Sequence, residues 1–299
     1  MRLAASLGPR NGHTAIFPDG DHTAPLRFFP LRLHEFEDGT HVVAAGDNSL
    51  LGCELLAIDG SAIGDVQLAV TPLISRDNAS TVRDRRPAAV VASDVLEGLG
   101  VAGRRASFRV RTPDGKRQEV ALDARVGALP GREPVEPMRA DMTGGVAYVA
   151  YNRTQPPPAG VLERIEGHVG AVILDLRRNG GGDNRTYGPL LHALERIGGD
   201  LRVLISRQTF SAAMQLIVDL ERDFAPTFYG EPTGGSPNQY GDARPVLLPA
   251  TGLRARVATI AWTTAGDDPR LAVEPHVPVA TTAADHFAGR DAVLEAALR

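Results

Sequence analysis

The hydrophobic pattern is clearest in two short apolar runs, residues 169–174 and 201–205. Both are rich in β-branched side chains, which favours buried strands over helices. The first run leads into residues 175–182, which read DLRRNGGG. The pattern therefore predicts two strands whose ends converge, with a glycine loop at the end of the first.

Helical spacing of apolar residues follows each predicted strand. The first helical pattern covers residues 187–197, with Asp183 or Asn184 as its predicted N-cap and two glycines as its end. The second pattern begins at Ser211, so this serine is predicted to lie where a loop enters a helix. The first N–H groups of a helix lack intrahelical partners and carry partial positive charge. Together with an N–H of the glycine loop, they could stabilise an oxyanion beside Ser211.

Each of these features also has a simpler explanation. A serine at the start of a helix is most often only a cap. Three glycines between a strand and a helix can hold a phosphate. However, the loop lacks the Gly-x-Gly-x-x-Gly spacing, and no Gly-Lys-Ser/Thr follows it, which argues against a nucleotide site.

The rest of the chain divides into a β-rich unit and a main body. Strand patterns with an Asp-Gly turn near residue 38 and a hairpin around Asp114-Gly115 predict the β-rich unit. A short strand is expected at residues 14–17, and a hairpin from two strands at 246–248 and 253–262. The predicted divisions are an N-terminal segment that contributes to the main body, the β-rich unit, a linker and the main body, at residues 1–26, 27–126, 127–139 and 140–299.

Composition and charge narrow the possible functions. The chain has 299 residues, of which 43% are hydrophobic, enough for a substantial core. A net charge of −4 gives no general attraction to nucleic acid. Cys53 is the only cysteine, so the chain can form neither an intramolecular disulfide nor a cysteine metal cluster.

No apolar run approaches the length of about 20 residues that a transmembrane helix needs. Residues 1–14 also lack the extended apolar core of a signal peptide. The sequence therefore leaves two expectations open: the protein is cytoplasmic, or it is a truncated form of an exported protein.

A family resemblance adds to this picture. Residues 175–182 resemble the Asp-Leu-Arg-x-Asn-x-Gly-Gly signature of the C-terminal processing (tail-specific) and tricorn-core serine peptidases. Residues 209–213 (TFSAA) resemble the nucleophile segment of these enzymes, 230–236 their next loop, and 289–298 their C-terminal helix. The resemblance implies an α/β fold with a ClpP/crotonase-like spiral core. It also implies serine peptidase activity on a peptide or protein substrate, with no cofactor and no metal.

The resemblance further implies roles for single residues. Ser211 is expected to be the nucleophile, and the N–H groups of Gly181 and Ala212 to form the oxyanion hole. His13 lies in a Gly-His-Thr segment that resembles the one carrying the histidine base in tricorn-like members. The long separation between His13 and Ser211 in the sequence is no objection, because such pairs meet in space.

The remaining part of the expected site departs from the family pattern. Residues 231–242 contain no lysine, and Arg244 is too basic to be a general base, which excludes a Ser–Lys mechanism with Ser211. Residues 272–276 resemble the Pro-Asp segment of the family, but His276 stands where an acid is usual, and it is a rival base. Three acids, each also typical of a solvated surface, are candidates for orienting the histidine: Glu274, Asp267 and Asp268.

Residues 50–60 resemble a PDZ pattern in which Cys53 replaces the usual acid. The β-rich unit is therefore expected to be a PDZ-like module, which either binds a peptide by edge addition or only packs on the main body. Because the lysine and an expected acid are missing, a catalytically inactive peptidase-fold protein that binds a peptide or an apolar small ligand is the alternative function. An acyl-CoA enzyme of the crotonase type would use the oxyanion hole but does not explain the serine.

Overall fold

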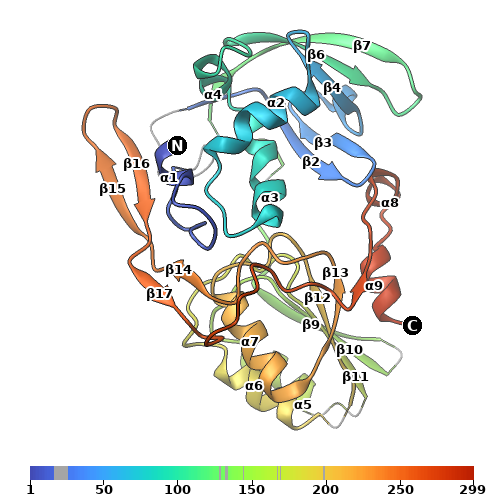
Figure 1. Cartoon of the computed structure of the whole chain (residues 1–299). Helices are drawn as coiled ribbons and strands as arrows, with labels where there is room; N and C mark the ends of the chain where they lie inside the picture. Colours follow the sequence, from blue (N-terminus) through green and yellow to red (C-terminus); the bar gives the residue numbers. More distant parts are fainter. Residues whose placement is uncertain are drawn as a thin grey trace.

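The computed structural model describes residues 1–16, 26–127, 129–131, 134–143, 145–166, 168, 170–197 and 199–299. Figure 1 shows two β-sheet units, one above the other, with α3 (Ala79–Val90) reaching from the upper unit toward the lower one. The N-terminal segment lies on one side of the molecule, and the C-terminal segment runs along the other. The prediction of a mixed α/β fold is confirmed.

The upper unit contains an antiparallel sheet in the order β2-β3-β4-β6-β7, with the short β5 paired to β4. Buried and exposed residues alternate along β6, as expected for a sheet with one covered face. Gly115 closes the predicted hairpin between β6 and β7 with a φ of 86°, a conformation that favours glycine. The strands are β2 (Leu31–Phe36), β3 (Gly39–Ala45), β4 (Glu54–Ile58), β5 (Ser61–Ala62), β6 (Arg105–Arg111) and β7 (Arg117–Asp123).

Helix α3 is an element that the sequence pattern did not reveal. Residues 83–86 in its middle are all charged and Pro87 follows them, so the apolar spacing is weak. A capping box starts the helix instead, with Asn78 Oδ1 accepting the N–H of Thr81 at 3.0 Å. The other helices of this unit are η1 (Asn48–Leu50), α2 (Ile63–Val70), η2 (Thr71–Leu73) and α4 (Ser93–Gly98).

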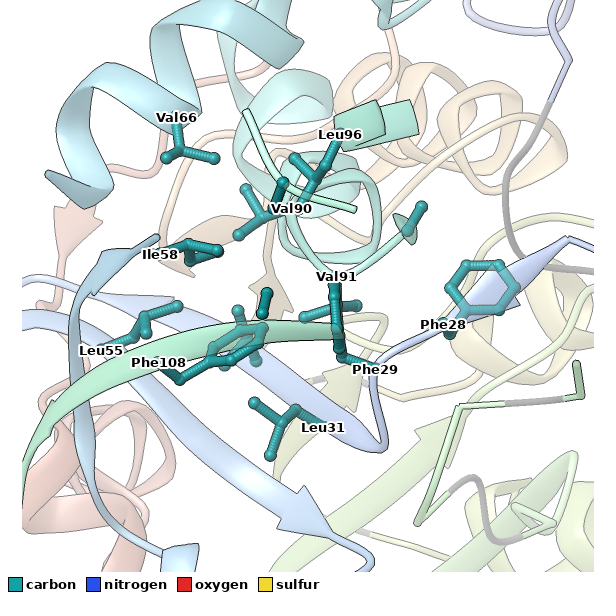
Figure 2. Close-up of a cluster of buried hydrophobic side chains, with 14 of the residues drawn as sticks. Phe28, Phe29, Leu31, Leu55, Ile58, Val66, Val90, Val91, Leu96 and Phe108 are labelled. Carbon is teal, nitrogen blue, oxygen red and sulfur yellow. The ribbon is translucent and has the colours of Figure 1, made fainter. Parts of the chain in front are cut away.

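The covered face of the upper sheet forms a hydrophobic core with these helices (Figure 2). Val66 of α2, Val90 of α3 and Leu96 of α4 belong to the same buried cluster as the strand residues. Phe108 is fully buried and meets Phe29 edge-on, with their ring centroids 4.8 Å apart. Each such buried side chain stabilises the unit by about 1.5–3 kcal/mol.

The lower unit contains a six-stranded sheet in the order β18-β13-β12-β11-β10-β9. All of its pairs are parallel except the pair of β9 and β10. The two apolar runs of the sequence form neighbouring strands, β11 and β12, as predicted, although Val169 lies outside the described residues. The strands are β9 (Met138–Thr143), β10 (Val146–Tyr151), β11 (Ala171–Asp175), β12 (Leu201–Ile205), β13 (Thr227–Gly230) and β18 (Val277–Pro278).

Helices cover both faces of this sheet. Val172 and Val203 belong to a buried cluster with residues of the helices on one face. Ile173 and Leu204, their neighbours in sequence, form a separate cluster with the C-terminal helix on the other face. This explains why the strands read as continuous apolar runs. The helices are α5 (Ala159–Glu166), α6 (Gly188–Glu195) and α7 (Ala212–Phe224) on one face and α9 (Ala292–Ala297) on the other.

The prediction of a side-chain N-cap at Asp183 or Asn184 is wrong. Helix α6 begins later, after Tyr187, with a proline in its first turn and no side-chain cap. Proline is compatible with the first turn because the N–H that it lacks would have no intrahelical partner. Asp183 instead pairs with Arg185, at 2.7 Å.

Two predicted strands are also different in the structure. At residues 14–17, Ala15 makes an isolated bridge to Arg256, and Phe17 lies outside the described residues. The run at 253–262 is two strands that pair with different partners.

Short elements complete the fold. In Figure 1 the hairpin of β15 (Arg244–Leu248) and β16 (Leu253–Val257) projects from the body. No helix in the described part of the chain has both the length and the apolar character needed to cross a membrane. The remaining elements are α1 (Arg2–Ala5), β1 (Arg27–Phe28) paired with β8 (Arg125–Val126), β14 (Gln239–Gly241) paired with β17 (Ile260–Trp262), and α8 (Ala283–Phe287).

Candidate active site

Ser211 lies between β12 and α7 in a strained backbone conformation. Its φ of 59° and ψ of −126° form a combination that residues with a side chain rarely adopt, at a cost of about 1–3 kcal/mol. Its side chain makes no capping hydrogen bond to the helix. Two hydrogen bonds fix the preceding loop: Thr209 Oγ1 donates to the carbonyl of Leu176 at 2.9 Å, and Phe210 N donates to the carbonyl of Asn179 at 3.0 Å. The serine is therefore held beside the glycine loop, with its hydroxyl available for another role.

The structure brings His13 to this hydroxyl. The distance between His13 Nε2 and Ser211 Oγ is 2.9 Å, although the residues are 198 positions apart in the chain. The imidazole stacks on the ring of Phe210, with the ring centroids 4.6 Å apart and the planes at 28°. The phenyl ring next to Ser211 thus fixes the plane of the imidazole.

The imidazole of His13 is neutral around physiological pH. Burial, followed by the positive charges of Arg85 and Arg256, lowers the pKa of His13 from 6.5 to about 3, and the backbone of Tyr240 opposes this shift. Nδ1 is buried and has no hydrogen-bond partner among the described residues. A neutral ring that carries its hydrogen on Nδ1 presents Nε2 as an acceptor to Ser211.

Asn179 shapes the glycine loop from a fully buried position. Its Oδ1 accepts the N–H of Gly181 at 2.9 Å and the hydroxyl of Thr154 at 3.1 Å, and its Nδ2 donates to the carbonyl of Tyr151 at 2.8 Å. Gly181 itself packs tightly, since a Cβ placed on it would lie 2.5 Å from Ser211 Cβ. The N–H of Gly181, expected to serve the oxyanion hole, is thus engaged by Asn179.

The N–H of the next residue, Gly182, is available instead. Thr154 pairs with Gly182 as in a parallel ladder, because Thr154 N donates to the carbonyl of Gly181 at 3.1 Å and Asp183 N donates to the carbonyl of Thr154 at 2.9 Å. In such a ladder the N–H of the central residue points away from its partner. The N–H groups of Gly182 and Ala212 donate to no group within the described residues.

The three acids that were expected to orient His13 lie elsewhere. Asp268 pairs with Arg270 at 2.7 Å. Asp267 and Glu274 are exposed, and neither makes a hydrogen bond or ion pair in the described part of the chain. The structure therefore brings none of these carboxylates to Nδ1 of His13.

His276, the rival base, has a structural contact. Its Nδ1 accepts the N–H of Phe228 at 3.0 Å, and its ring stacks on Phe228 with the centroids 5.5 Å apart. Phe228 lies near the start of β13, whereas Ser211 follows the end of the parallel neighbour β12. The side chains of His276 and Ser211 therefore lie near opposite ends of these parallel strands.

Two polar residues near the site were not identified from the sequence. Gln239 Nε2 donates to the backbone carbonyl of Ser211 at 2.9 Å, and its Oε1 is buried without a partner in the described structure. Asp77 is fully buried and accepts the N–H of Gly12, directly before His13, at 2.7 Å. A single Gln or Asp in a loop gives no sequence signal, although the Asn78-x-x-Thr81 capping box marks the helix that follows Asp77. No group of His, Cys, Asp and Glu residues that could hold a metal ion occurs among the residues that the structure describes.

Comparison with solved structures shows what the fold is similar to. Mature CPAF shares this fold, so the expected resemblance is confirmed at the level of the fold. Mature CPAF matches with a TM-score of 0.66 and 16% identity, over 95% of this chain and 82% of CPAF. Mature CPAF complexed with lactacystin matches with a TM-score of 0.62 and 16% identity, over 90% of this chain and 82% of CPAF.

Two other proteases match less well. A photosystem II D1 C-terminal processing protease has a TM-score of 0.39 and 14% identity, over 86% of this chain and 73% of that protein. Tricorn protease also has a TM-score of 0.39 and 14% identity, over 93% of this chain and 28% of tricorn. These two values are too low to carry an argument. No protein-family model and no curated protein sequence matches the chain.

Proposed function

We propose that the protein is a serine peptidase in which Ser211 is the nucleophile and His13 is the general base. The observation that carries the proposal is the 2.9 Å contact between His13 Nε2 and the hydroxyl of the strained Ser211. A nucleophile and a base within hydrogen-bond reach of each other are the signature of an activated nucleophile. The shared fold with CPAF is consistent with hydrolysis of a peptide or protein substrate.

The proposed reaction proceeds through an acyl-enzyme. Ser211 Oγ attacks the scissile carbonyl carbon while His13 Nε2 takes the hydroxyl proton. The proton then passes to the leaving amine as the C–N bond breaks. A water molecule, deprotonated by His13, attacks the Ser211 ester, and the proton passes from His13 to Ser211 Oγ as the ester C–O bond breaks and the acid product leaves.

The oxyanion of both tetrahedral intermediates needs two N–H donors. We assign Ala212, at the positive end of α7, and Gly182, whose N–H points away from Thr154. Gly181 then has a positioning role, because its missing side chain allows Ser211 to approach the loop. One such donor is worth about 3–4 kcal/mol of transition-state stabilisation.

The low basicity of His13 sets a requirement on the complex with substrate. With a pKa of about 3 instead of 6.5, protonating His13 costs about 5 kcal/mol more than for an ordinary histidine. A negative oxyanion that forms beside the ring favours the imidazolium and offsets part of this cost. Excluding the remaining water strengthens that attraction.

The finer architecture belongs to the same proposal. We assign residues 140–299 to a ClpP/crotonase-like core and residues 27–126 to a PDZ-like module. The core assignment is supported by successive β–α units that build a parallel sheet covered on both faces. The module assignment is supported by an antiparallel sheet that packs on α2 and α3.

Labelling with a fluorophosphonate probe tests the function. The wild type is expected to be modified stoichiometrically at Ser211 and to hydrolyse a denatured protein substrate, while Ser211→Ala loses both reactions and keeps its circular dichroism spectrum. Ser61→Ala, which removes a serine of the upper unit, is the matched control and should behave like the wild type. A wild-type protein that stays unlabelled at high probe concentration would contradict the proposal and favour a non-catalytic carrier of a peptide or apolar ligand.

A further inference from the structure

Asp77 links the loop that carries His13 to the loop that follows β13. It lies directly before α3 and has no exposed surface. Its Oδ1 accepts the N–H of Gly12 at 2.7 Å, and its Oδ2 accepts the N–H of Ser236 at 3.1 Å. Gly12 immediately precedes His13, and Ser236 lies in the loop that follows β13. One carboxylate of the upper unit thus contacts both the His13 loop and the loop after β13.

The helix does not need this carboxylate. Asn78, not Asp77, is the N-cap of α3, and its Oδ1 accepts the N–H of Thr81. Among the described residues, the hydrogen-bond donors to the Asp77 carboxylate are the two loop N–H groups. A buried carboxylate is costly without such partners. The contacts with the two loops therefore account for its position.

Neighbouring contacts fix the loop before His13. Asn11 N donates to the carbonyl of Arg76 at 3.3 Å, and Arg85 Nη1 donates to the carbonyl of Gly12 at 2.7 Å. The fit is also sterically tight, because a Cβ on Gly12 would lie 2.8 Å from Asp77 Oδ1 and 3.0 Å from Phe210 Cζ. The loop is thus held between Asp77 and the phenyl ring on which His13 stacks.

The same segment holds the loop on the side of Ser211. Asn78 Nδ2 donates to the carbonyl of Thr233 at 3.0 Å, and Thr81 Oγ1 donates to the carbonyl of Gly234. Gly235 N in turn donates to the carbonyl of Thr209, two residues before Ser211, at 3.0 Å. A continuous set of hydrogen bonds therefore runs from the start of α3 to the nucleophile segment.

We propose that ionised Asp77 is a positioning residue for the peptidase proposed above, holding the His13 loop in register with the Ser211 loop. The upper unit then supplies a residue that positions the catalytic pair. The carboxylate is needed because each oxygen accepts one N–H; a protonated carboxyl or an amide turns a donor toward one of these N–H groups.

The burial of Asp77 makes this role depend on pH. Burial raises the pKa of Asp77 from 3.8 to about 6, while the N–H groups of Gly12 and Ser236 and the charges of Arg85 and Arg10 favour the carboxylate. Arg85 faces it from α3, Arg10 from the N-terminal loop, and the loop after β13 contributes the N–H of Ser236. Protonation of Asp77 is therefore expected to lower activity as the pH falls through about 6, because the pKa of His13 lies much lower.

The test compares Asp77→Asn with the wild type in two measurements. The first is the rate of Ser211 modification by the fluorophosphonate as a function of pH. The wild-type rate should fall as the pH falls through about 6, and the variant should be slower by about tenfold or more near neutral pH and lack this limb. The second is amide hydrogen exchange of Gly12 and Ser236, which should be faster in the variant whether or not the protein is an enzyme.

Controls separate this inference from the proposed function. Asp65→Asn removes an exposed carboxylate of the same unit and should leave both measurements unchanged. If Asp77→Asn does not fold, Gly12→Ala disturbs the same contact with every carboxylate retained and should give the same slower labelling and faster exchange. Unchanged exchange and an unchanged pH profile in the folded variant would overturn the inference. A wild type that is never labelled would overturn the peptidase instead, and faster exchange in Asp77→Asn would still support the link between the loops.

Discussion

Replacing Asn179 with alanine isolates the contribution of the glycine loop. The side chain is fully buried and makes three hydrogen bonds, to the N–H of Gly181, the hydroxyl of Thr154 and the carbonyl of Tyr151. The substitution leaves all three groups without this partner in a place that water does not reach. At about 1 kcal/mol for each buried group, the free energy of unfolding should fall by about 3 kcal/mol.

The same change should also slow the chemistry at Ser211. Without Asn179, Gly181 is free to turn, and the N–H of Gly182 loses its fixed direction. Because removing one oxyanion donor costs about 10²–10³ in rate, fluorophosphonate labelling of Ser211 should slow about 100-fold. Binding of the probe before reaction should change much less, since these donors act on the transition state.

Urea unfolding and labelling kinetics measure the two effects on one protein preparation. Asn152→Ala is the matched control, because the side chain of Asn152 makes a single exposed hydrogen bond, to the carbonyl of Glu136 at 2.9 Å. Its free energy of unfolding should fall by about 1 kcal/mol or less, and its Ser211 should be labelled at the wild-type rate. If Asn179→Ala instead labels as fast as Asn152→Ala, the glycine loop does not form part of the oxyanion hole.

Three further predictions concern stability and are checked by urea unfolding. Arg177 forms ion pairs with Asp175 at 2.6 Å and with Asp291 at 2.7 Å. Arg177→Met leaves the buried carboxylate of Asp175 without its ion pair and should lower the free energy of unfolding by about 3–5 kcal/mol. A decrease below about 1 kcal/mol would contradict this. Phe108→Ala in the cluster of Figure 2 should also cost about 3–5 kcal/mol, and an unchanged midpoint would show that this core does not limit stability. Burial, with nearby cationic groups, lowers the pKa of His34 from 6.5 to about 3, so its contribution to stability is lost as the pH falls below 6.5. When the pH falls from about 7.5 to 5, the free energy of unfolding of the wild type should decrease by about 2 kcal/mol more than that of His34→Gln. Equal decreases would refute the lowered pKa of His34.

The sequence determined the local elements around Ser211 because each has its own signal. Two apolar runs gave β11 and β12, and helical spacing gave α6 and α7. The apolar signal failed at one helix of the upper unit. Helix α3 has four charged residues in its middle, and its capping box supplies the start that apolar spacing does not show.

The assembly of the site was decided by the tertiary structure. That His13 reaches Ser211 and that no expected acid reaches the imidazole both depend on contacts between distant segments. Sequence patterns report which groups neighbour one another along a strand or helix. They carry no such information for a loop such as that of Asp77, whose partners lie 65 and 159 residues away and are met only when both units pack together.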